Sequence, residues 1–256
     1  MRKTILIFLF ILFFGGLATL VFGFYNARSI RHFSASAENL IAKYDGALRI
    51  KEAEKDYQKS GTRDALQLKG ETDNFLSKLD EMTASAEAAK QEVDRLNVPL
   101  TEMGIKDEMK DYYSKAGTQI QDAKNISEFM NQVFQVAVIF GKIKGDVDLD
   151  QMKNLITEAK SENTKVDVTG LPKNIEANGR SLKKATDDFL AEMEKVAGGT
   201  TENSDQLNAA YDEFSNKVNE FSTSSRGFIS SAEDLTPLQG KIRSDLGDLQ
   251  KIYFKI

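Results

Sequence analysis

The sequence predicts an all-α protein: an N-terminal transmembrane helix followed by an elongated antiparallel helical bundle with coiled-coil-like packing. Three observations predict this. The run Ile5–Tyr25 contains no charged side chain. Beyond Arg28, apolar residues recur at alternating spacings of three and four, which is the period of helices packed along a seam. Only three prolines occur among the 256 residues, so long helices are permitted almost everywhere.

The run Ile5–Tyr25 is long enough to cross a bilayer, because a helix of this length reaches about 32 Å at about 1.5 Å per residue. A cleavable signal peptide has an apolar region of only about 7–15 residues. Its best cleavage site here, Val21-Phe22-Gly23, is followed by the bulky residues Phe24 and Tyr25. We therefore expect residues 1–27 to form an uncleaved, signal-like membrane anchor, with a cleaved signal as the alternative.

Basic residues flank this run unequally. Arg2, Lys3 and the amino terminus precede it, and Arg28 and Arg31 follow it. The difference of about one charge favours a cytoplasmic amino end, because positive charge is retained on the cytoplasmic side. We expect a single-pass protein of the cell membrane with residues 26–256 outside the cytoplasm.

The helical-bundle domain is expected to cover residues 28–256, as one bundle or as two stacked modules. Its first helix should run to about Ser60 and then either break at Gly61-Thr62 or continue to Leu96. The later helices are expected at residues 100–145, 150–161, 174–197, 203–234 and 237–256.

Local signals mark several helix ends and the core. Thr236-Pro237 fits an N-cap followed by proline at the first helical position. Asp148 or Asp150 fits the cap of the short helix, and Gly198-Gly199 should form a turn. Apolar residues at the seam spacing are expected in the core, among them Phe75, Leu79, Phe214, Val218 and Phe221.

Charge and composition argue against several classes of function. The first 31 residues hold four basic and no acidic side chains, so the formal charge of −5 becomes −9 (−5 − 4) for residues 32–256. An acidic body is a poor match for nucleic acid. With no cysteine and with His32 as the single histidine, cysteine nucleophiles, histidine triads and zinc sites lack their residues. We expect no catalysis, no cofactor and no metal.

One stretch resembles a known family. Residues Ala47–Leu66 have the sequence ALRIKEAEKDYQKSGTRDAL. This stretch resembles the first helix and bend of the extracytoplasmic sensor domains of chemoreceptors and sensor kinases, and the helical bimodular type is similar in length and helix count. The resemblance implies two stacked bundles and a small-molecule ligand. Those receptors carry a second span and a signalling domain after the sensor, whereas this sequence ends at Ile256, so the resemblance implies signalling through a partner.

Two function classes stay open. The first is an envelope scaffold or docking protein that is anchored in the bilayer and acts by non-covalent contact with a protein partner or with itself. Its expected interaction surface is the stripe on the last helix, which should pack either on the bundle or on a partner: Ile242, Leu246, Leu249, Tyr253 and Ile256. The second is a sensor-type module for a small ligand such as a carboxylate, which Arg49, Arg63 and Arg180 would bind.

Overall fold

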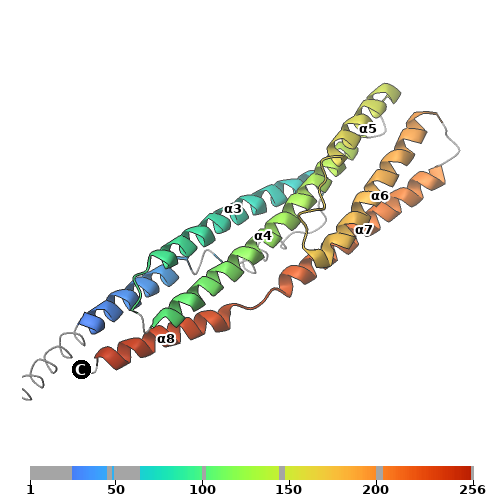
Figure 1. Ribbon diagram of the computed structural model, residues 1–256. Helices are drawn as coiled ribbons and strands as arrows, with labels where there is room; N and C mark the ends of the chain where they lie inside the picture. Colours follow the sequence, from blue (N-terminus) through green and yellow to red (C-terminus); the bar gives the residue numbers. More distant parts are fainter. Residues whose placement is uncertain are drawn as a thin grey trace, which may run out of the picture. The chain divides into compact units, whose positions relative to one another are not determined.

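The computed structural model describes residues 25–44, 48, 64–99, 102–143, 148–199 and 204–254, and every regular element among them is helical (Figure 1). The first helix covers residues 25–44. It is followed by α3 (Ala65–Arg95), α4 (Met103–Phe140), α5 (Leu149–Asn163), α6 (Lys173–Ala197), α7 (Ser204–Ser230) and α8 (Thr236–Phe254). The predicted all-α fold class is confirmed for this part of the chain.

The expected anchor falls almost wholly outside the described residues, which begin at Tyr25. Within the described part of the chain, no helix combines the length and the apolar character that crossing a bilayer requires. The expected helix through Ser60 and the break at Gly61-Thr62 also lie outside the described residues.

The ends of the later helices follow local capping chemistry. The carboxylate of Asp148 accepts a hydrogen bond from the Gln151 amide at 2.8 Å, so the predicted cap of α5 is confirmed. After α6, Gly199 has a φ of 85°, a conformation that glycine adopts without steric cost.

The cap predicted at Thr236 is wrong by one residue. Helix α8 already includes Thr236, because the Gln239 amide donates to the carbonyl of Leu235 at 3.0 Å. The exposed Thr236 amide is instead satisfied by the carboxylate of Asp234 at 3.0 Å. The helix predicted to reach residue 234 ends earlier, at Ser230.

The described chain divides into two compact units, each assembled from separated stretches of sequence. Of the described residues, unit 1 contains 25–44, 48, 85–99, 102–116 and 234–254, and unit 2 contains 64–84, 117–143, 148–199 and 204–233. Helices α3 and α4 therefore contribute residues to both units, and neither unit is simply the first or second half of the chain.

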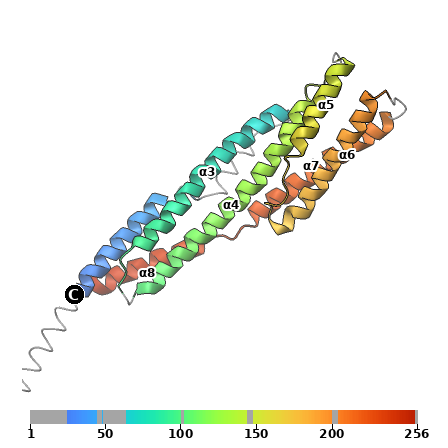
Figure 2. The same cartoon turned by 45° about the horizontal axis from the view of Figure 1, so that its top comes forward.

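Unit 1 is a bundle of four helical segments: residues 25–44, the end of α3, the start of α4, and α8 (Figure 2). Its core is built from apolar side chains of all four segments, including Ile30, Phe33, Val93, Met109, Ile242 and Leu246. Polar contacts also join the segments, one of them at the buried Ser34. The Gln250 amide donates to the Ser34 hydroxyl at 3.1 Å, and Lys110 pairs with Asp94 at 2.7 Å.

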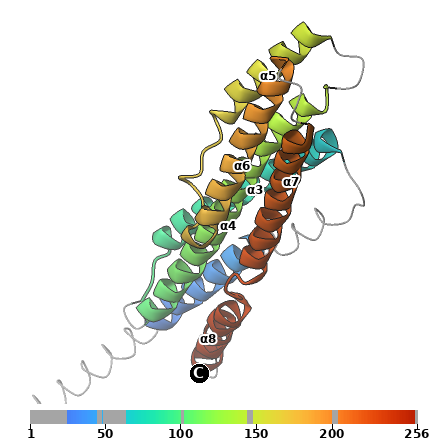
Figure 3. The same ribbon diagram turned by 90° about the vertical axis from the view of Figure 1, so that its right-hand side faces the viewer.

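Unit 2 contains the start of α3, the end of α4, and helices α5 to α7 (Figure 3). Helix α6 packs against both α5 and α7. The predicted core residues Phe75, Leu79, Phe214 and Phe221 are buried here, whereas Val218 is only half-buried. The rings of Phe189 and Phe214 stack with their planes 13° apart, and Phe140 meets both edge-on.

Candidate functional site

Of the three arginines predicted to bind a ligand, Arg180 alone lies among the described residues. Arg49 and Arg63 lie outside the described residues. Arg180 is exposed on α6 and pairs with Glu176 one turn earlier, with its Nε 3.2 Å from the carboxylate oxygen. Exposed pairs of this kind contribute only about 0.3–0.5 kcal/mol. Arg180 lines neither of the two pockets described below.

The apolar stripe of α8 packs on the chain's own bundle. Ile242, Leu246 and Leu249 are buried in unit 1. The side chain of Tyr253 and all of Ile256 lie outside the described parts. In this structure the three buried residues are therefore not open to a partner, and the packing that we expected takes place within the chain.

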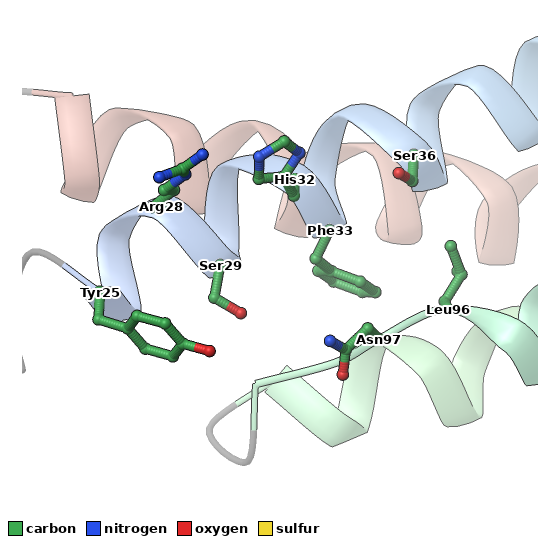
Figure 4. A pocket seen from close by; sticks show the side chains of 8 residues that line it. All are labelled: Tyr25, Arg28, Ser29, His32, Phe33, Ser36, Leu96 and Asn97. Atoms are coloured by element: carbon green, nitrogen blue, oxygen red, sulfur yellow. The ribbon is translucent and has the colours of Figure 1, made fainter.

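A groove of about 330 Å³ lies in unit 1 beside the start of the helix of residues 25–44 (Figure 4). In Figure 4, Tyr25 and Ser29 project toward Asn97 in the loop after α3, whereas Arg28 and His32 rise from the other edge of the same helix. We call it the N-terminal groove. It is lined by Tyr25, Arg28, Ser29, His32, Phe33, Ser36, Leu96 and Asn97.

The N-terminal groove has a basic and hydroxylic lining without an acidic side chain. Among the described residues, neither Arg28 nor His32 makes a hydrogen bond or an ion pair. The opposite wall is fixed by Lys106, whose ammonium donates to the carbonyls of Asp94 and Leu96 at 2.9 and 3.0 Å. A groove that has an unpaired guanidinium at one edge and a fixed wall at the other is suited to binding an anionic group.

A second pocket, of about 200 Å³, lies in unit 2 between α4 and the end of α7. Phe228, Ile229 and Ala232 form its apolar side. The Gln119 amide donates to the carbonyl of Glu233 at 3.0 Å and so joins α4 to the segment after α7. We call it the Asp122 pocket, because that carboxylate on α4 also lines it.

Asp122 is a half-buried carboxylate without a charged partner. Burial raises the pKa of its carboxyl group above the ordinary value of 3.8. Within the described chain it accepts no hydrogen bond and pairs with no cation. An unpaired carboxylate beside an apolar wall is suited to a positively charged group with a hydrocarbon body.

Sequence reasoning missed both pockets. The arginines near helix breaks pointed elsewhere, and an isolated aspartate at the edge of an apolar stripe gives no signal in a chain with 39 acidic residues. Among the described residues no group of histidine, cysteine and carboxylate side chains is placed to hold a metal ion.

Comparison of the chain with protein-family models, with curated proteins and with solved structures finds no match.

Proposed function

We propose that this protein is a membrane-anchored helical module that works outside the cytoplasm by non-covalent contact with another protein. One observation carries the proposal: the uncharged apolar run Ile5–Tyr25 stands directly before an acidic helical body. The all-helical fold of the described residues and the absence of any thiol in the sequence support binding rather than catalysis.

The protein contact needs an apolar surface, and Tyr211 on α7 is the best candidate in unit 2. Its side chain is 54% exposed. Its ring centroid lies 5.7 Å from that of the buried Phe189, which holds it against the aromatic cluster. An exposed aromatic ring with few accessible rotamers loses little entropy on binding, and tyrosine is enriched among the residues that dominate interface energies.

The contact can be tested with a photoreactive amino acid placed at Tyr211 in the membrane-bound chain. Irradiation should give one adduct of discrete mass, which contains either a second copy or a different protein. The same probe at Leu66, which is 66% exposed, is the matched control and should give no such adduct. A discrete adduct at both positions, or at neither, would contradict a contact at Tyr211.

The anchor is tested by fractionation. The full chain should stay with membranes after an alkaline carbonate wash, and a variant without residues 5–24 should appear in the soluble fraction. Release of the full chain by the wash would contradict an integral anchor.

The Asp122 pocket favours a second candidate function, a sensor-type module for a small ligand. Its chemistry suggests a small amine rather than the carboxylate expected from the sequence, because Asp122 offers a negative charge beside Phe228 and Ile229. Alkylamines should raise the melting temperature of the wild type and not of Asp122→Asn. An equal rise in the two proteins would contradict this site.

A further inference from the structure

We propose that the N-terminal groove binds the phosphate of an acidic phospholipid headgroup in the same membrane that anchors the chain. This proposal rests on the proposed function, because it requires residues 5–24 to cross the bilayer. The argument uses the groove's place in the sequence, its charge and its preformed wall.

The position of the groove matches the depth of the headgroups. The hydrocarbon core of a bilayer is about 30 Å thick and the whole bilayer about 40–45 Å, so each headgroup layer is about 5–7 Å deep. Tyr25 ends the apolar run and is 75% exposed, as is typical of aromatic residues at the membrane interface. Arg28 lies three residues further, about 4.5 Å along the helix axis, and His32 about 10.5 Å. Arg28 would thus lie within the headgroup layer and His32 about 3 Å beyond it, on the side away from the hydrocarbon.

The charge of the groove is opposite to that of most of the chain. Residues 32–256 carry a formal charge of −9 (−5 − 4), and an anionic membrane surface repels such a body. The groove instead presents the guanidinium of Arg28 and the imidazole of His32, with no acidic residue in its lining. Arginine donates two parallel hydrogen bonds to a phosphate group, and the hydroxyls of Ser29 and Ser36 add further donors.

The groove is also built to receive a group larger than an ion. Phe33 is buried beneath it and Leu96 closes its far end. Lys106 fixes the Leu96 carbonyl at 3.0 Å, so this wall does not have to become ordered when the groove is filled. A volume of about 330 Å³ has room for a phosphate together with its glycerol backbone.

The test uses the full chain in nanodiscs made from equal amounts of phosphatidylcholine and phosphatidylglycerol. After transfer to detergent, native mass spectrometry counts the lipids that stay bound. The wild type should retain one phosphatidylglycerol in preference to phosphatidylcholine, and Arg28→Gln should lower this preference about tenfold, as expected for loss of a hydrogen bond between charged groups. Arg28→Lys should restore part of it, because lysine binds phosphate as a point charge.

The control variant is Arg226→Gln, which removes the same charge from an exposed position on α7 in unit 2. It should retain phosphatidylglycerol as the wild type does. Equal retention of the two lipids by the wild type, or an equal loss in both glutamine variants, would overturn the proposal. Displacement of the bound lipid by soluble glycerol phosphate at equal concentration would also overturn it, because the groove would then be a site for anions from solution.

Flotation with vesicles separates failure of this proposal from failure of the proposed function. A chain that floats with vesicles but does not prefer phosphatidylglycerol keeps its anchor and contradicts only the headgroup site. A chain that does not float contradicts the anchor, and the headgroup proposal with it.

Discussion

Gly179 on α6 is the position where the packing of unit 2 makes the sharpest prediction. A β-carbon added at Gly179 would lie 2.3 Å from Cδ1 of Leu171, 3.5 Å from Cε2 of Phe221 and 3.6 Å from Cζ of Phe129. The last two distances are ordinary contacts, but carbon atoms do not approach to 2.3 Å. Leu171 would therefore have to retreat by about 1.2 Å (3.5 − 2.3).

Retreat is costly because Leu171 is itself buried in unit 2. Overpacking of this kind costs about 1–3 kcal/mol. Alanine also favours the helix over glycine by about 1 kcal/mol, which offsets part of that cost. The matched control is Gly70→Ala, because Gly70 lies in the interior of α3 and a β-carbon there meets nothing within 4 Å. The helix preference is common to both substitutions, so Gly179→Ala should be less stable than Gly70→Ala by about 1–3 kcal/mol.

Urea unfolding of the full chain in detergent, followed by far-UV circular dichroism, measures this difference. A second comparison tests the cause. In the double variant Leu171→Ala/Gly179→Ala the clash is absent, so the two substitutions should couple favourably by about 0.5–3 kcal/mol. If Gly179→Ala were as stable as Gly70→Ala, the close approach of α6 to Leu171 would be refuted.

Three further predictions concern the core and the titrating groups. Phe214→Ala should lower the free energy of unfolding by about 3–5 kcal/mol in the same assay, whereas Val218→Ala should cost less because Val218 is half-buried. Hydrogen bonds from Lys43 at 2.6 Å and from Tyr44 hold the pKa of Glu92 below its ordinary value of 4.5. A carboxylate with a lowered pKa stabilises the fold above pH 4.5, and this contribution is lost as the pH falls further. Glu92→Gln should therefore have a lower free energy of unfolding than the wild type at pH 7, and the difference should shrink as the pH falls below 4.5. Burial raises the pKa of Asp122, so the charged carboxylate destabilises the fold at neutral pH. Asp122→Asn should therefore be more stable than the wild type at pH 7, and this difference should vanish below pH 3.8, where Asp122 is protonated in both the folded and the unfolded chain.

Among the described residues, the sequence predicts the helices well because helix formation depends on local spacing. The positions of Phe75, Leu79, Phe214 and Phe221 follow the seam period, and all four are buried. The cap at Asp148 is predictable because it is equally local: the Asp148 carboxylate accepts a hydrogen bond from the amide of Gln151, three residues later. At Thr236 the predicted cap is wrong because the helix already includes this residue, whose amide donates to the carboxylate of Asp234.

The composition of the two units is not predictable from the same patterns. Unit 1 joins residues that are far apart in the sequence, as in the contact between Ser34 and Gln250. A heptad stripe shows that a helix has an apolar side, but it does not show which helix covers that side. For the same reason the stripe at Ile242, Leu246 and Leu249 predicts packing within the chain and packing on a partner equally well.

The candidate sites were hidden for a similar reason. Arg28 and Asn97 line one groove although about 70 residues separate them, and the groove exists only when α3 returns beside the first helix. Asp122 is half-buried and has no partner among the described residues, and both are properties of the folded chain.

Membrane topology is the most direct test of the proposed function, and the chain is well suited to it because it has no cysteine. Two single-cysteine variants suffice: Ser161→Cys on the exposed surface of α5, and Thr4→Cys before the apolar run. A membrane-impermeant maleimide applied to intact protoplasts or spheroplasts should label Ser161→Cys at once and Thr4→Cys only after lysis. The reverse pattern, or labelling of neither variant before lysis, would contradict a single-pass protein with its helical body outside the cytoplasm.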